Sequence, residues 1–405
     1  MKTADVVIIG AGVNGASVAY NLAHKGLKKV VLLEKGLVAA GGTGRSAAIV
    51  RQHYSHPELV KMVKRSVEIF HDFEDIVGGD PGFVKCGWAF LVPDYVSDGF
   101  SQNLKMQQNL GIETQEITKC ELLKMEPRIN LDNVHRICYE KGSGYASPHK
   151  TTYSYVQKFC QLGGELMQTT AAVGLKIENG QVTGVCTEEG DISTEVVINA
   201  AGPWAKVVAL WAGLDIPIQV TREEEIIIES ADVDKPPNMV FSDMVNAIYY
   251  RPDGLSRILV GRGFPKEYEN VDPDHFNQLV GKAFIQETWK LFLRRFPVFS
   301  RAIVINAYTG LYDVTPDWNP ILGRVEEVQG FYMCAGFSGH GFKIAPSVGE
   351  LMAEEIGLGG EQVANVNCFA LSRNNSFRTS ETLSLLLNSK MLFFSMVAYL
   401  SLIHI

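Results

Sequence analysis

An α/β fold is predicted for this chain, in detail an α+β composite in which a parallel-sheet domain carries an inserted mixed-sheet domain. Three features indicate it: a strand–helix–strand pattern over residues 5–34, a buried strand that runs into small residues at 195–205, and a glycine-rich segment at 336–346 that precedes a helical pattern. Apolar strand-like runs that alternate with helical patterns are typical of parallel sheets. Because these features lie far apart in the chain, the segments between them are predicted to form the insertion.

The two predicted domains are therefore discontinuous in sequence. We expect the parallel-sheet domain to comprise residues 1–80, 145–215 and 329–373, and the inserted domain to comprise residues 81–144 and 216–328. Inside the insertion, a mixed sheet is predicted by strand-like runs at 225–228, 247–250 and 258–260 and a helix near 276–296.

The composition is that of an ordinary globular protein and argues against some classes of function. The chain has 405 residues, 46% of them hydrophobic and 20% charged, with a formal net charge of -8. An acidic chain of this kind is not expected to bind nucleic acid. Its seven cysteines form no C-x-x-C pair, which predicts a reducing, cytoplasmic location rather than a disulfide framework.

Neither end of the chain predicts a membrane segment. No signal or transit peptide is recognised before the first strand, because the apolar run at 6–9 is too short. Residues 391–405 are nearly all apolar, yet they fall short of the roughly 20 residues needed to span a bilayer. We expect residues 374–405 to be a disordered or non-native tail, and we do not expect membrane attachment.

The strand–helix–strand pattern at the beginning of the chain has the spacing of a nucleotide-binding turn. A strand at 6–9, a helix at 16–25 and a strand at 30–33 enclose the sequence GAGVNG. Its glycines permit a tight bend, the approach of a pyrophosphate, and the close packing of helix on strand, in the order Gly10, Gly12 and Gly15.

An acidic residue completes this motif. Glu34 ends the second strand, where an acid typically binds a ribose hydroxyl. The helix between the two strands offers unpaired backbone N–H groups to phosphates at its N-terminus. A Rossmann-like dinucleotide site is therefore predicted.

The stretch GGTGRSAAIVRQHYS, residues 41–55, favours FAD over NAD as the dinucleotide. An NAD-binding domain normally continues with further strand–helix units, whereas this chain inserts a glycine-rich loop that carries arginines. The stretch resembles the loop after the second strand in the FAD-dependent amino acid oxidase superfamily, in particular its sarcosine oxidase and dimethylglycine dehydrogenase-like branch. EVVINAAGPWA (195–205) and GFSGHGFK (336–343) resemble two further cofactor segments of that family, in the same order. An NAD-linked dehydrogenase, the other class considered, would leave GFSGHGFK without a purpose.

The resemblance covers residues 4–373 and implies a set of FAD-binding residues. Besides the three glycines and Glu34, it implies a backbone contact from Val173 to the adenine and a helix N-terminus that faces the pyrimidine edge of the flavin. The remaining implied cofactor residues are Lys35, Gly42, Thr43, Arg45, Ser46, Ala200, Gly202, Trp204, Gly336, Gly339, His340, Gly341, Phe342 and Lys343.

The resemblance also implies the residues that contact the substrate. Arg51 and Lys343 match the positions that grip a substrate carboxylate, for which the planar fork of arginine is suited. Tyr312 matches an aromatic residue of the substrate pocket. Tyr250, or its neighbour Tyr249, is expected to cap that pocket.

Two departures from the family pattern refine the prediction. Gly310 stands where some relatives carry a cysteine bound covalently to FAD, so we expect non-covalent FAD. Leu259 is aligned with a lysine that helps dioxygen react in the oxidases, which favours a dehydrogenase over an oxidase. No metal site is expected, because His53 and His56 have no ligand cluster beside them in the sequence.

These features together predict an FAD-dependent oxidoreductase that oxidises the C–N bond of a small N-alkylated amino acid, sarcosine-like or dimethylglycine-like, to an imine. Its substrate would be a small carboxylated secondary or tertiary amine, and its electron acceptor dioxygen or an electron-transfer partner. Hydride transfer needs the neutral amine, and the sequence identifies no protein base. The alternative is a non-catalytic flavoprotein subunit of a larger complex, or an assembly or electron-transfer factor of such a complex. In that case the chain would belong to a hetero-oligomer.

Overall fold

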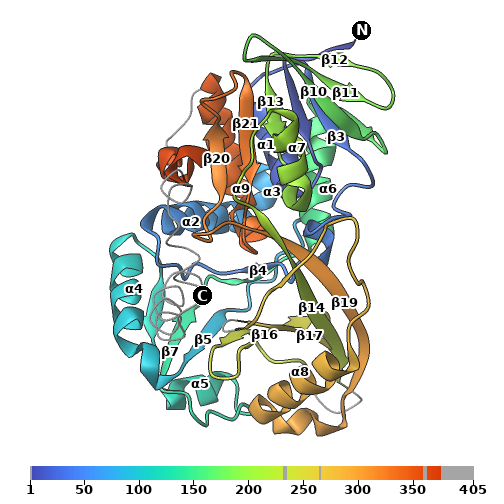
Figure 1. Ribbon diagram of the computed structural model, residues 1–405. Helices are drawn as coiled ribbons and strands as arrows, with labels where there is room; N and C mark the ends of the chain where they lie inside the picture. Colours follow the sequence, from blue (N-terminus) through green and yellow to red (C-terminus); the bar gives the residue numbers. More distant parts are fainter. Residues whose placement is uncertain (1, 231–234, 264–265, 359–362, 375–405) are drawn as a thin grey trace, which may run out of the picture.

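The computed structural model describes residues 2–230, 235–263, 266–358 and 363–374. The expectation for the tail at 374–405 falls outside these residues, apart from Asn374. In Figure 1 the chain forms two stacked parts, an upper part around a parallel sheet and a lower part around a larger mixed sheet. The fold class predicted from the sequence is thereby confirmed.

The upper part contains what we call the parallel sheet, with strand order β20-β21-β13-β2-β3-β9. Neighbouring strands run parallel except β20, which pairs antiparallel with β21 at one edge. Every residue of Val6–Ile9 is buried, as expected for a strand covered on both faces. The strands are β2 (Val6–Ile9), β3 (Val30–Glu34), β9 (Glu165–Gln168), β13 (Val197–Asn199), β20 (Ile321–Arg324) and β21 (Phe331–Ala335).

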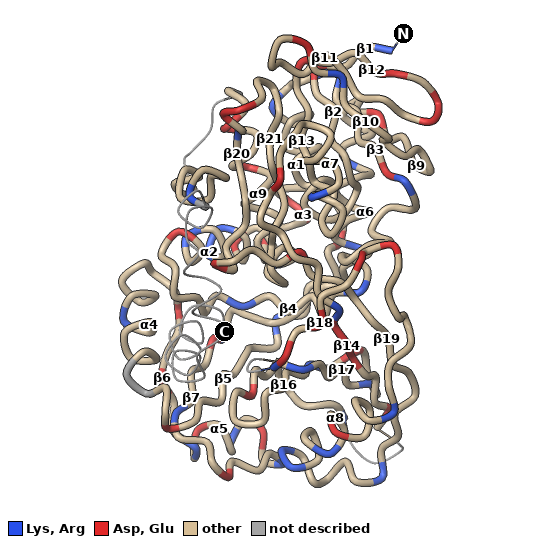
Figure 2. Tube along the Cα trace, in the orientation of Figure 1, with Lys and Arg blue, Asp and Glu red and all other residues tan. Residues whose placement is uncertain are grey.

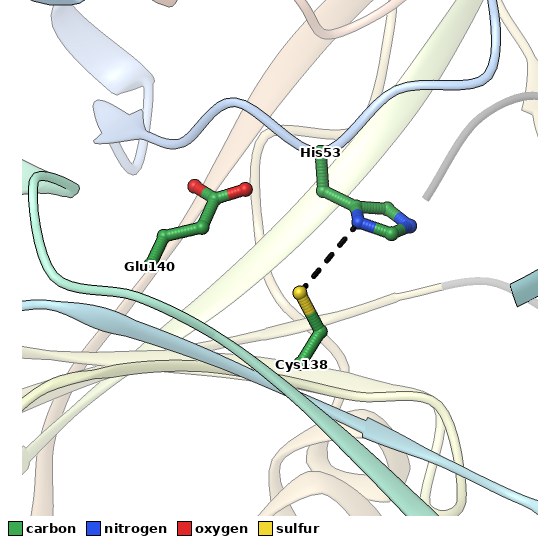
Figure 3. Close-up of side chains that lie close together, drawn as sticks. All are labelled: His53, Cys138 and Glu140. Carbon is green, nitrogen blue, oxygen red and sulfur yellow. Dashed lines mark hydrogen bonds between the residues drawn. The ribbon is translucent and has the colours of Figure 1, made fainter. Parts of the chain in front are cut away.

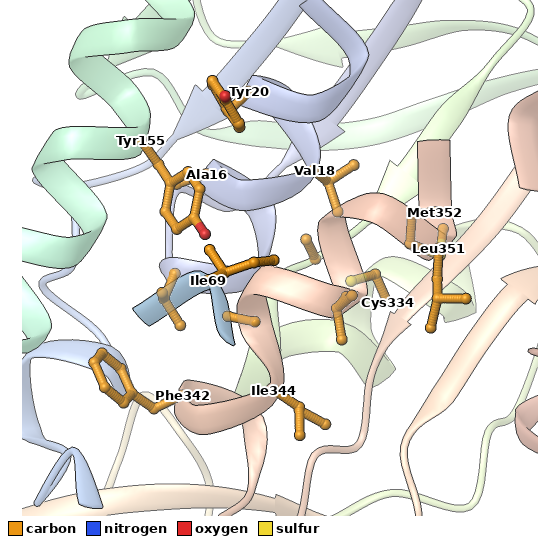
Figure 4. Packing of buried hydrophobic residues seen from close by; sticks show 14 of the residues in the cluster. Ala16, Val18, Tyr20, Ile69, Tyr155, Cys334, Phe342, Ile344, Leu351 and Met352 are labelled. Atoms are coloured by element: carbon orange, nitrogen blue, oxygen red, sulfur yellow. The ribbon is translucent and has the colours of Figure 1, made fainter. Parts of the chain in front are cut away.

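Helices cover one face of the parallel sheet. Side chains of these helices form one apolar cluster with Val6 and Ile8, and Figure 4 shows Ala16 and Val18 of the first helix near Leu351 and Met352 of the last. The helices are α1 (Val13–His24), α2 (Pro57–His71), α3 (Phe73–Ile76), α6 (Pro148–Gln161) and α9 (Gly341–Ala353).

A small sheet and one helix cover the opposite face. Val7 and Ile9 point to this side and pack with α7 (Ala205–Trp211) and the small sheet. A turn at Asn179-Gly180 joins two of its strands. The small sheet consists of β1 (Lys2–Thr3), β10 (Ala172–Glu178), β11 (Gln181–Thr187) and β12 (Ile192–Ser193).

The lower part is built on what we call the large sheet, ordered β18-β14-β17-β16-β15-β5-β7-β6, with β19 beside β14. β5 and β15 run parallel and the other neighbours antiparallel, so the sheet is mixed, as predicted. Its strands are β5 (Trp88–Val92), β6 (Thr114–Glu116), β7 (Arg136–Glu140), β14 (Gln219–Glu229), β15 (Val240–Asp243), β16 (Ile248–Asp253), β17 (Arg257–Arg262), β18 (Glu269–Asn270) and β19 (Ile303–Val314).

Shorter elements complete the fold. β4 (Ile49–Val50) and β8 (Gly144–Tyr145) form a small antiparallel pair. The remaining helices are α4 (Ser97–Asn109), α5 (Lys119–Met125) and α8 (Lys282–Arg295), and the latter packs an apolar face on the large sheet. Single turns are η1 (Thr43–Arg45), η2 (Asp94–Val96), η3 (Gly202–Trp204), η4 (Pro297–Arg301), η5 (Glu354–Leu358), η6 (Val366–Phe369) and η7 (Leu371–Asn374).

One predicted boundary differs from the observed topology. β20 lies inside the segment 216–328 that we assigned to the insertion, but it pairs with β21 of the parallel sheet. The chain thus returns to the parallel sheet by residue 321, before the predicted boundary at residue 329. Among the described residues, no helix is both long enough and apolar enough to cross a membrane.

Candidate active site

A cavity of about 520 Å³ opens at the carboxyl ends of the strands of the parallel sheet. Its walls come from the turn after β2, the end of β3, the 40–46 loop, the turn after β13 and the beginning of α9. In open α/β sheets this edge is where ligands bind. The volume lies in the range of about 300–1,000 Å³ that small-molecule and cofactor sites occupy.

The glycines of the first turn create this space. Gly10 has φ +107°, and a Cβ there would lie 2.5 Å from the carbonyl oxygen of Ala200. A Cβ on Gly15 would lie 2.0 Å from the carbonyl oxygen of Gly10, so this residue lets α1 pack closely on the turn. Gly12 precedes α1 and faces the hydroxyl of Thr43, which accepts a hydrogen bond of 3.0 Å from the amide of Val13. The helix N-terminus is therefore open toward the cavity, as a pyrophosphate requires.

The acid at the end of β3 holds the rim of the cavity. The carboxylate of Glu34 accepts hydrogen bonds from the amides of Ala11 (2.9 Å) and Gly36 (2.8 Å). Each carboxylate oxygen retains a further lone pair for a ribose hydroxyl. These features fit the dinucleotide predicted from the sequence.

Most of the predicted cofactor residues line this cavity. They are Gly10, Gly12, Glu34, Lys35, Gly42, Thr43, Ser46, Ala200, Gly202, Trp204, Gly339, Gly341 and Phe342. Arg45 instead donates to the carbonyl of Thr309 (3.3 Å), and the amide of Gly336 donates to Asp313 (2.6 Å). The side chain of Val173 is 50% exposed, while its neighbour Ala172 lines the cavity. Arg45, Gly336 and Val173 therefore lie outside the lining, as do Gly15, His340 and Lys343.

The inserted part contributes a lining residue that the sequence did not single out. Asp274 accepts a hydrogen bond of 2.7 Å from the indole of Trp204 and pairs with Lys35 at 3.2 Å. The Lys35 ammonium lies 3.7 Å from the centre of the Trp204 ring. No motif pointed to Asp274, because it comes from a loop far along the chain.

A second cavity of about 150 Å³ adjoins the first and shares Ser46, Tyr312, Gly339 and Phe342 with it. Arg51 and Lys343 both line it, and each is 8% exposed. Arg51 follows β4 and Lys343 is the third residue of α9, so two distant segments bring two cations to one small space. His340, at the N-cap of α9, also lines this cavity.

The guanidinium of Arg51 is held by aromatic rings and a backbone carbonyl. Its central carbon lies 4.7 Å from the Tyr54 ring centre and 5.5 Å from that of Trp88, and it donates to the carbonyl of His53. The Tyr54 hydroxyl lies 2.9 Å from Nδ1 of His340. These contacts fix the orientation of Arg51, which forms no ion pair with a carboxylate among the described residues.

Behind Arg51 lies a fully buried group of three side chains, His53, Cys138 and Glu140 (Figure 3). Their nearest N, S and O atoms lie within 4.8 Å of one another. The Cys138 sulfur is 2.9 Å from the Thr114 hydroxyl and 3.9 Å from Nδ1 of His53. Burial lowers the pKa of His53 to about 3 and, against the pull of Arg51, raises the pKa of Glu140 to about 7.

Glu140 also anchors the segment that carries Arg51. Its carboxylate accepts hydrogen bonds from the amide of Gln52 (2.8 Å) and the hydroxyl of Ser143 (2.5 Å). Because these protein groups already engage the cluster, we interpret it as a support for Arg51. The prediction that no metal is bound remains a prediction.

The structure decides which of the predicted tyrosines line the second cavity. Tyr312 lines both cavities, and Tyr249 lines the second, where its hydroxyl donates to Glu225 at 2.6 Å. Tyr250 does not, since its ring stacks on Phe241 at 5.1 Å in the core beneath α8. The assignment of Tyr250 to the pocket is therefore wrong, because neighbouring residues of a strand point to opposite faces of the sheet.

The prediction that Leu259 occupies the position of the oxidases' lysine is also corrected. Leu259 is buried in β17 and does not line the second cavity, whereas Lys266 does. The ammonium of Lys266 pairs with Glu223 of β14 and lies 5.0 Å from the Tyr268 ring centre and 5.8 Å from that of Tyr312. Figure 2 shows acidic residues along β14. A cation is thus present in the pocket, supplied by the loop after β17.

A parallel sheet with this glycine turn, this acid and this cavity defines a dinucleotide-binding protein of the Rossmann type. Residues 5–355 match the family described as FAD dependent oxidoreductase (DAO). The chain belongs to this family, and several of its relatives are named as oxidases or dehydrogenases of amines and amino acids.

Individual relatives have low identity but cover most of the chain. The β subunit of sarcosine oxidase from Rhodobacter capsulatus is 26% identical over 377 residues, 90% of this chain and 87% of that protein. The mitochondrial regulatory subunit of pyruvate dehydrogenase phosphatase from Mus musculus is 27% identical over 392 residues, 94% of this chain and 44% of that protein. The crystal structure of L-proline dehydrogenase from P. horikoshii superposes with a TM-score of 0.86 at 29% identity, covering 93% of this chain and 99% of that chain. The predictions of family, fold and FAD are confirmed.

Proposed function

We propose that this protein binds FAD without a covalent link and oxidises the C–N bond of a small secondary or tertiary amine that carries a carboxylate. The observation that carries the proposal is the pair Arg51 and Lys343. Both are buried basic side chains, neither forms an ion pair with a carboxylate among the described residues, and both face a cavity that shares a wall with the cofactor cavity. Two such groups can both carry charge at low cost only when a ligand supplies a negative charge beside them.

The size of the second cavity supports a small substrate. About 150 Å³ holds an amino acid with few side-chain atoms, such as sarcosine, dimethylglycine or proline, and excludes a peptide. Two relatives are named for sarcosine oxidation and proline dehydrogenation, and both substrates are secondary amines with a carboxylate. That chemistry is proposed for this chain on the same grounds.

The residues have separate roles in the proposed reaction. Arg51 forms two parallel hydrogen bonds to the carboxylate, which fixes the direction of the substrate. Tyr312 and Phe342, which line both cavities, separate the reacting carbon from bulk water. When bound, FAD supplies the two-electron acceptor, and the protein supplies orientation and electrostatics.

Anaerobic reduction of the purified holoenzyme tests the proposal. A panel of sarcosine, dimethylglycine, proline, glycine and the carboxylate-free amine dimethylamine would be mixed with the protein, and flavin absorbance would be recorded. We expect bleaching with at least one carboxylated secondary or tertiary amine and none with dimethylamine. Bleaching by dimethylamine alone would contradict the role of the carboxylate.

The alternative function is a non-catalytic flavoprotein subunit or an assembly or electron-transfer factor of a larger complex. Two relatives are named as subunits, one of them regulatory, which favours it. The same experiment separates the two functions. A protein that binds FAD, keeps its flavin oxidised with every amine and co-purifies with other chains in a defined ratio would be such a subunit.

We also propose that the protein is a dehydrogenase and not an oxidase, now for a different reason than the placement of Leu259. Dioxygen accepts its first electron more readily where an uncompensated cation stabilises superoxide. Lys266 lines the substrate cavity, but the Glu223 carboxylate offsets its charge, and the carboxylate of the bound substrate or product would offset the charge of Arg51. We further propose a reducing, cytoplasmic location, because the seven cysteines are free.

A further inference from the structure

Lys343 stands out among the cations of the second cavity. Lys266 pairs with Glu223, and Arg262 pairs with Glu287 at 3.0 Å. The ammonium group of Lys343 makes no hydrogen bond or ion pair with any residue that the structure describes, although the side chain is only 8% exposed. A charged amine in such a place has no counter-ion among the described residues and little contact with bulk solvent.

Three features of the surroundings disfavour the charged form of Lys343. Burial comes first and the neighbouring Arg51 guanidinium second, and together they hold the pKa of Lys343 well below its usual value. Lys343 is also the third residue of α9, where the helix dipole presents a partial positive charge. All three act in the same direction.

No other nearby group offsets them. Asp243, which lines the same cavity, forms a two-point ion pair with Arg295 (2.8 and 3.0 Å). On the helices packed against α9, Arg65 of α2 pairs with Glu350 at 2.8 Å. Besides Arg51, the other titratable or charged side chains that line the cavity are those of Tyr249, Tyr268, Tyr312 and His340 and the paired cations Arg262 and Lys266.

We infer that Lys343 is a neutral amine in the substrate-free enzyme and accepts the ammonium proton of the substrate when the carboxylate binds. The inference rests on the proposed function and adds the base that the sequence did not reveal. It assigns Lys343 two linked roles, in which the bound carboxylate favours the charged lysine and the charged lysine retains the carboxylate.

The chemistry of this step balances. An aliphatic amino acid reaches the enzyme as a zwitterion, since its amine is protonated at neutral pH. One N–H bond of the ammonium breaks, and the proton binds the lone pair on Nζ of Lys343, with no electrons exchanged. The substrate then holds a neutral amine, whose lone pair can assist loss of a hydride from the adjacent carbon. Loss of that hydride would leave the substrate as an iminium ion, and FAD, when bound, would supply the acceptor for the hydride and its two electrons.

The inference predicts that a carboxylate without an amine takes a proton from solvent when it binds. Acetate is a suitable probe because it has the carboxylate and no ammonium group. The holoenzyme would be titrated with acetate at pH 8, with binding followed by flavin absorbance and proton uptake by calorimetry in two buffers of different ionisation enthalpy. We expect uptake of nearly one proton for each acetate bound, because the anion raises the proton affinity of Lys343.

Variants identify the group that takes the proton. Lys343→Met should bind acetate more weakly and take up no proton, and Lys343→Arg should bind acetate with its charge already in place and take up none. Lys266→Met is the matched control: it removes another lysine of the same cavity, yet uptake should persist because that lysine is already paired with Glu223.

The pH dependence of reduction by the substrate gives a second readout. In Lys343→Arg the rate of flavin reduction should rise with pH, following the free substrate amine, while the wild-type rate should persist to lower pH. A role of Lys343 in carboxylate binding alone would change KM and leave the two pH profiles alike.

The outcomes separate this inference from the function on which it rests. Acetate that binds without proton uptake, or uptake that persists in Lys343→Met, would overturn the inference and leave the carboxylate site intact. Acetate that does not bind the holoenzyme at all would overturn the proposed carboxylate site and the inference with it.

Discussion

The carboxylate of Asp313 accepts a hydrogen bond of 2.6 Å from the backbone amide of Gly336, across 23 residues of sequence. The same oxygen accepts from the amide of Phe337 at 3.2 Å, and the amide of Ser338 donates to the Asp313 carbonyl at 2.9 Å. Asp313 ends the stretch of β19 that lines the cofactor cavity. One carboxylate thereby joins the large sheet to the glycine-rich loop before α9.

Replacing Asp313 with alanine should loosen this loop and weaken FAD binding. Two backbone amides would lose their acceptor, and a buried donor left without a partner costs about 1–3 kcal/mol. We expect a lower free energy of unfolding of the holoenzyme and faster release of FAD, followed by flavin fluorescence after dilution. Asp313→Asn, which keeps one acceptor oxygen, is the control. Its free energy of unfolding and its rate of FAD release should lie between those of the wild-type protein and the alanine variant. FAD release at the wild-type rate in the alanine variant would contradict this role.

The flavin should leave the denatured protein. Gly310 occupies the place of the linking cysteine in β19, and its backbone passes close to Arg45, with a built Cβ 3.5 Å from the Cβ of Arg45. We expect acid precipitation to leave a colourless pellet and a yellow supernatant. A pellet that retains flavin absorbance after washing in denaturant would show a covalent link through another residue.

Replacing Arg51 with alanine should weaken substrate capture far more than FAD binding. Arg51 lines the second cavity and not the first. Loss of a charge-assisted hydrogen bond costs about 1.5–3 kcal/mol, which corresponds to roughly a 10- to 100-fold fall in kcat/KM. Arg51→Lys keeps the charge without the fork and serves as the matched control. Wild-type kcat/KM in Arg51→Ala with a carboxylated amine would refute the carboxylate-binding role.

The stability conferred by Glu140 should decline as the pH rises. Its folded-state pKa is raised to about 7, mainly by burial, so this side chain contributes fully below its ordinary pKa of 4.5 and loses that contribution as the pH passes 7. Glu140→Gln cannot lose a proton. We therefore expect its free energy of unfolding, relative to wild type, to improve between pH 5 and pH 8 by up to about 3 kcal/mol. A difference between the two proteins that stays constant over this range would refute the shifted pKa.

The first strand–helix–strand unit and its part of the cofactor site could be predicted from the sequence, because the interactions that form them join residues close together in the chain. Gly10, Gly12, Gly15 and Glu34 lie within one strand–helix–strand unit, whose apolar runs and glycine spacing fix the turn. The predicted strand at 6–9 matches β2. The helix predicted from residue 16 begins at Val13, since a helix can begin directly in such a glycine turn.

Other features depend on register and on distant partners. Tyr249 and Tyr250 are adjacent in β16, so a shift of one residue decides which of them faces the cavity. Lys266 reaches the second cavity from the segment after β17. The sequence pattern does not fix which residue of this region matches the lysine of the oxidases, so the prediction placed Leu259 at that position. Lys343 has no ion-pair partner among the described residues because none of the neighbouring segments described places a carboxylate beside it. A sequence motif describes one segment and cannot show this.

The last prediction concerns the electron acceptor. Glu223 of β14 offsets the charge of Lys266 and also accepts a hydrogen bond of 3.0 Å from the hydroxyl of Thr221. In the reduced enzyme, this compensated charge should give little help to superoxide formation. We expect the wild-type protein to pass electrons to an artificial dye much faster than to dioxygen.

Glu223→Gln isolates the cause, because it keeps the shape of the side chain and removes its charge. Lys266 would then be an uncompensated cation beside the substrate cavity, and we expect faster reoxidation by dioxygen in stopped-flow experiments, with hydrogen peroxide formed. Adding Lys266→Met should return the rate to the wild-type level, since the cation is then gone. Equal rates in all three proteins would show that Lys266 does not govern the reaction with dioxygen. If air-saturated buffer reoxidises the wild-type protein as fast as it turns over, the protein is an oxidase, and the pairing of Lys266 with Glu223 does not suppress the reaction.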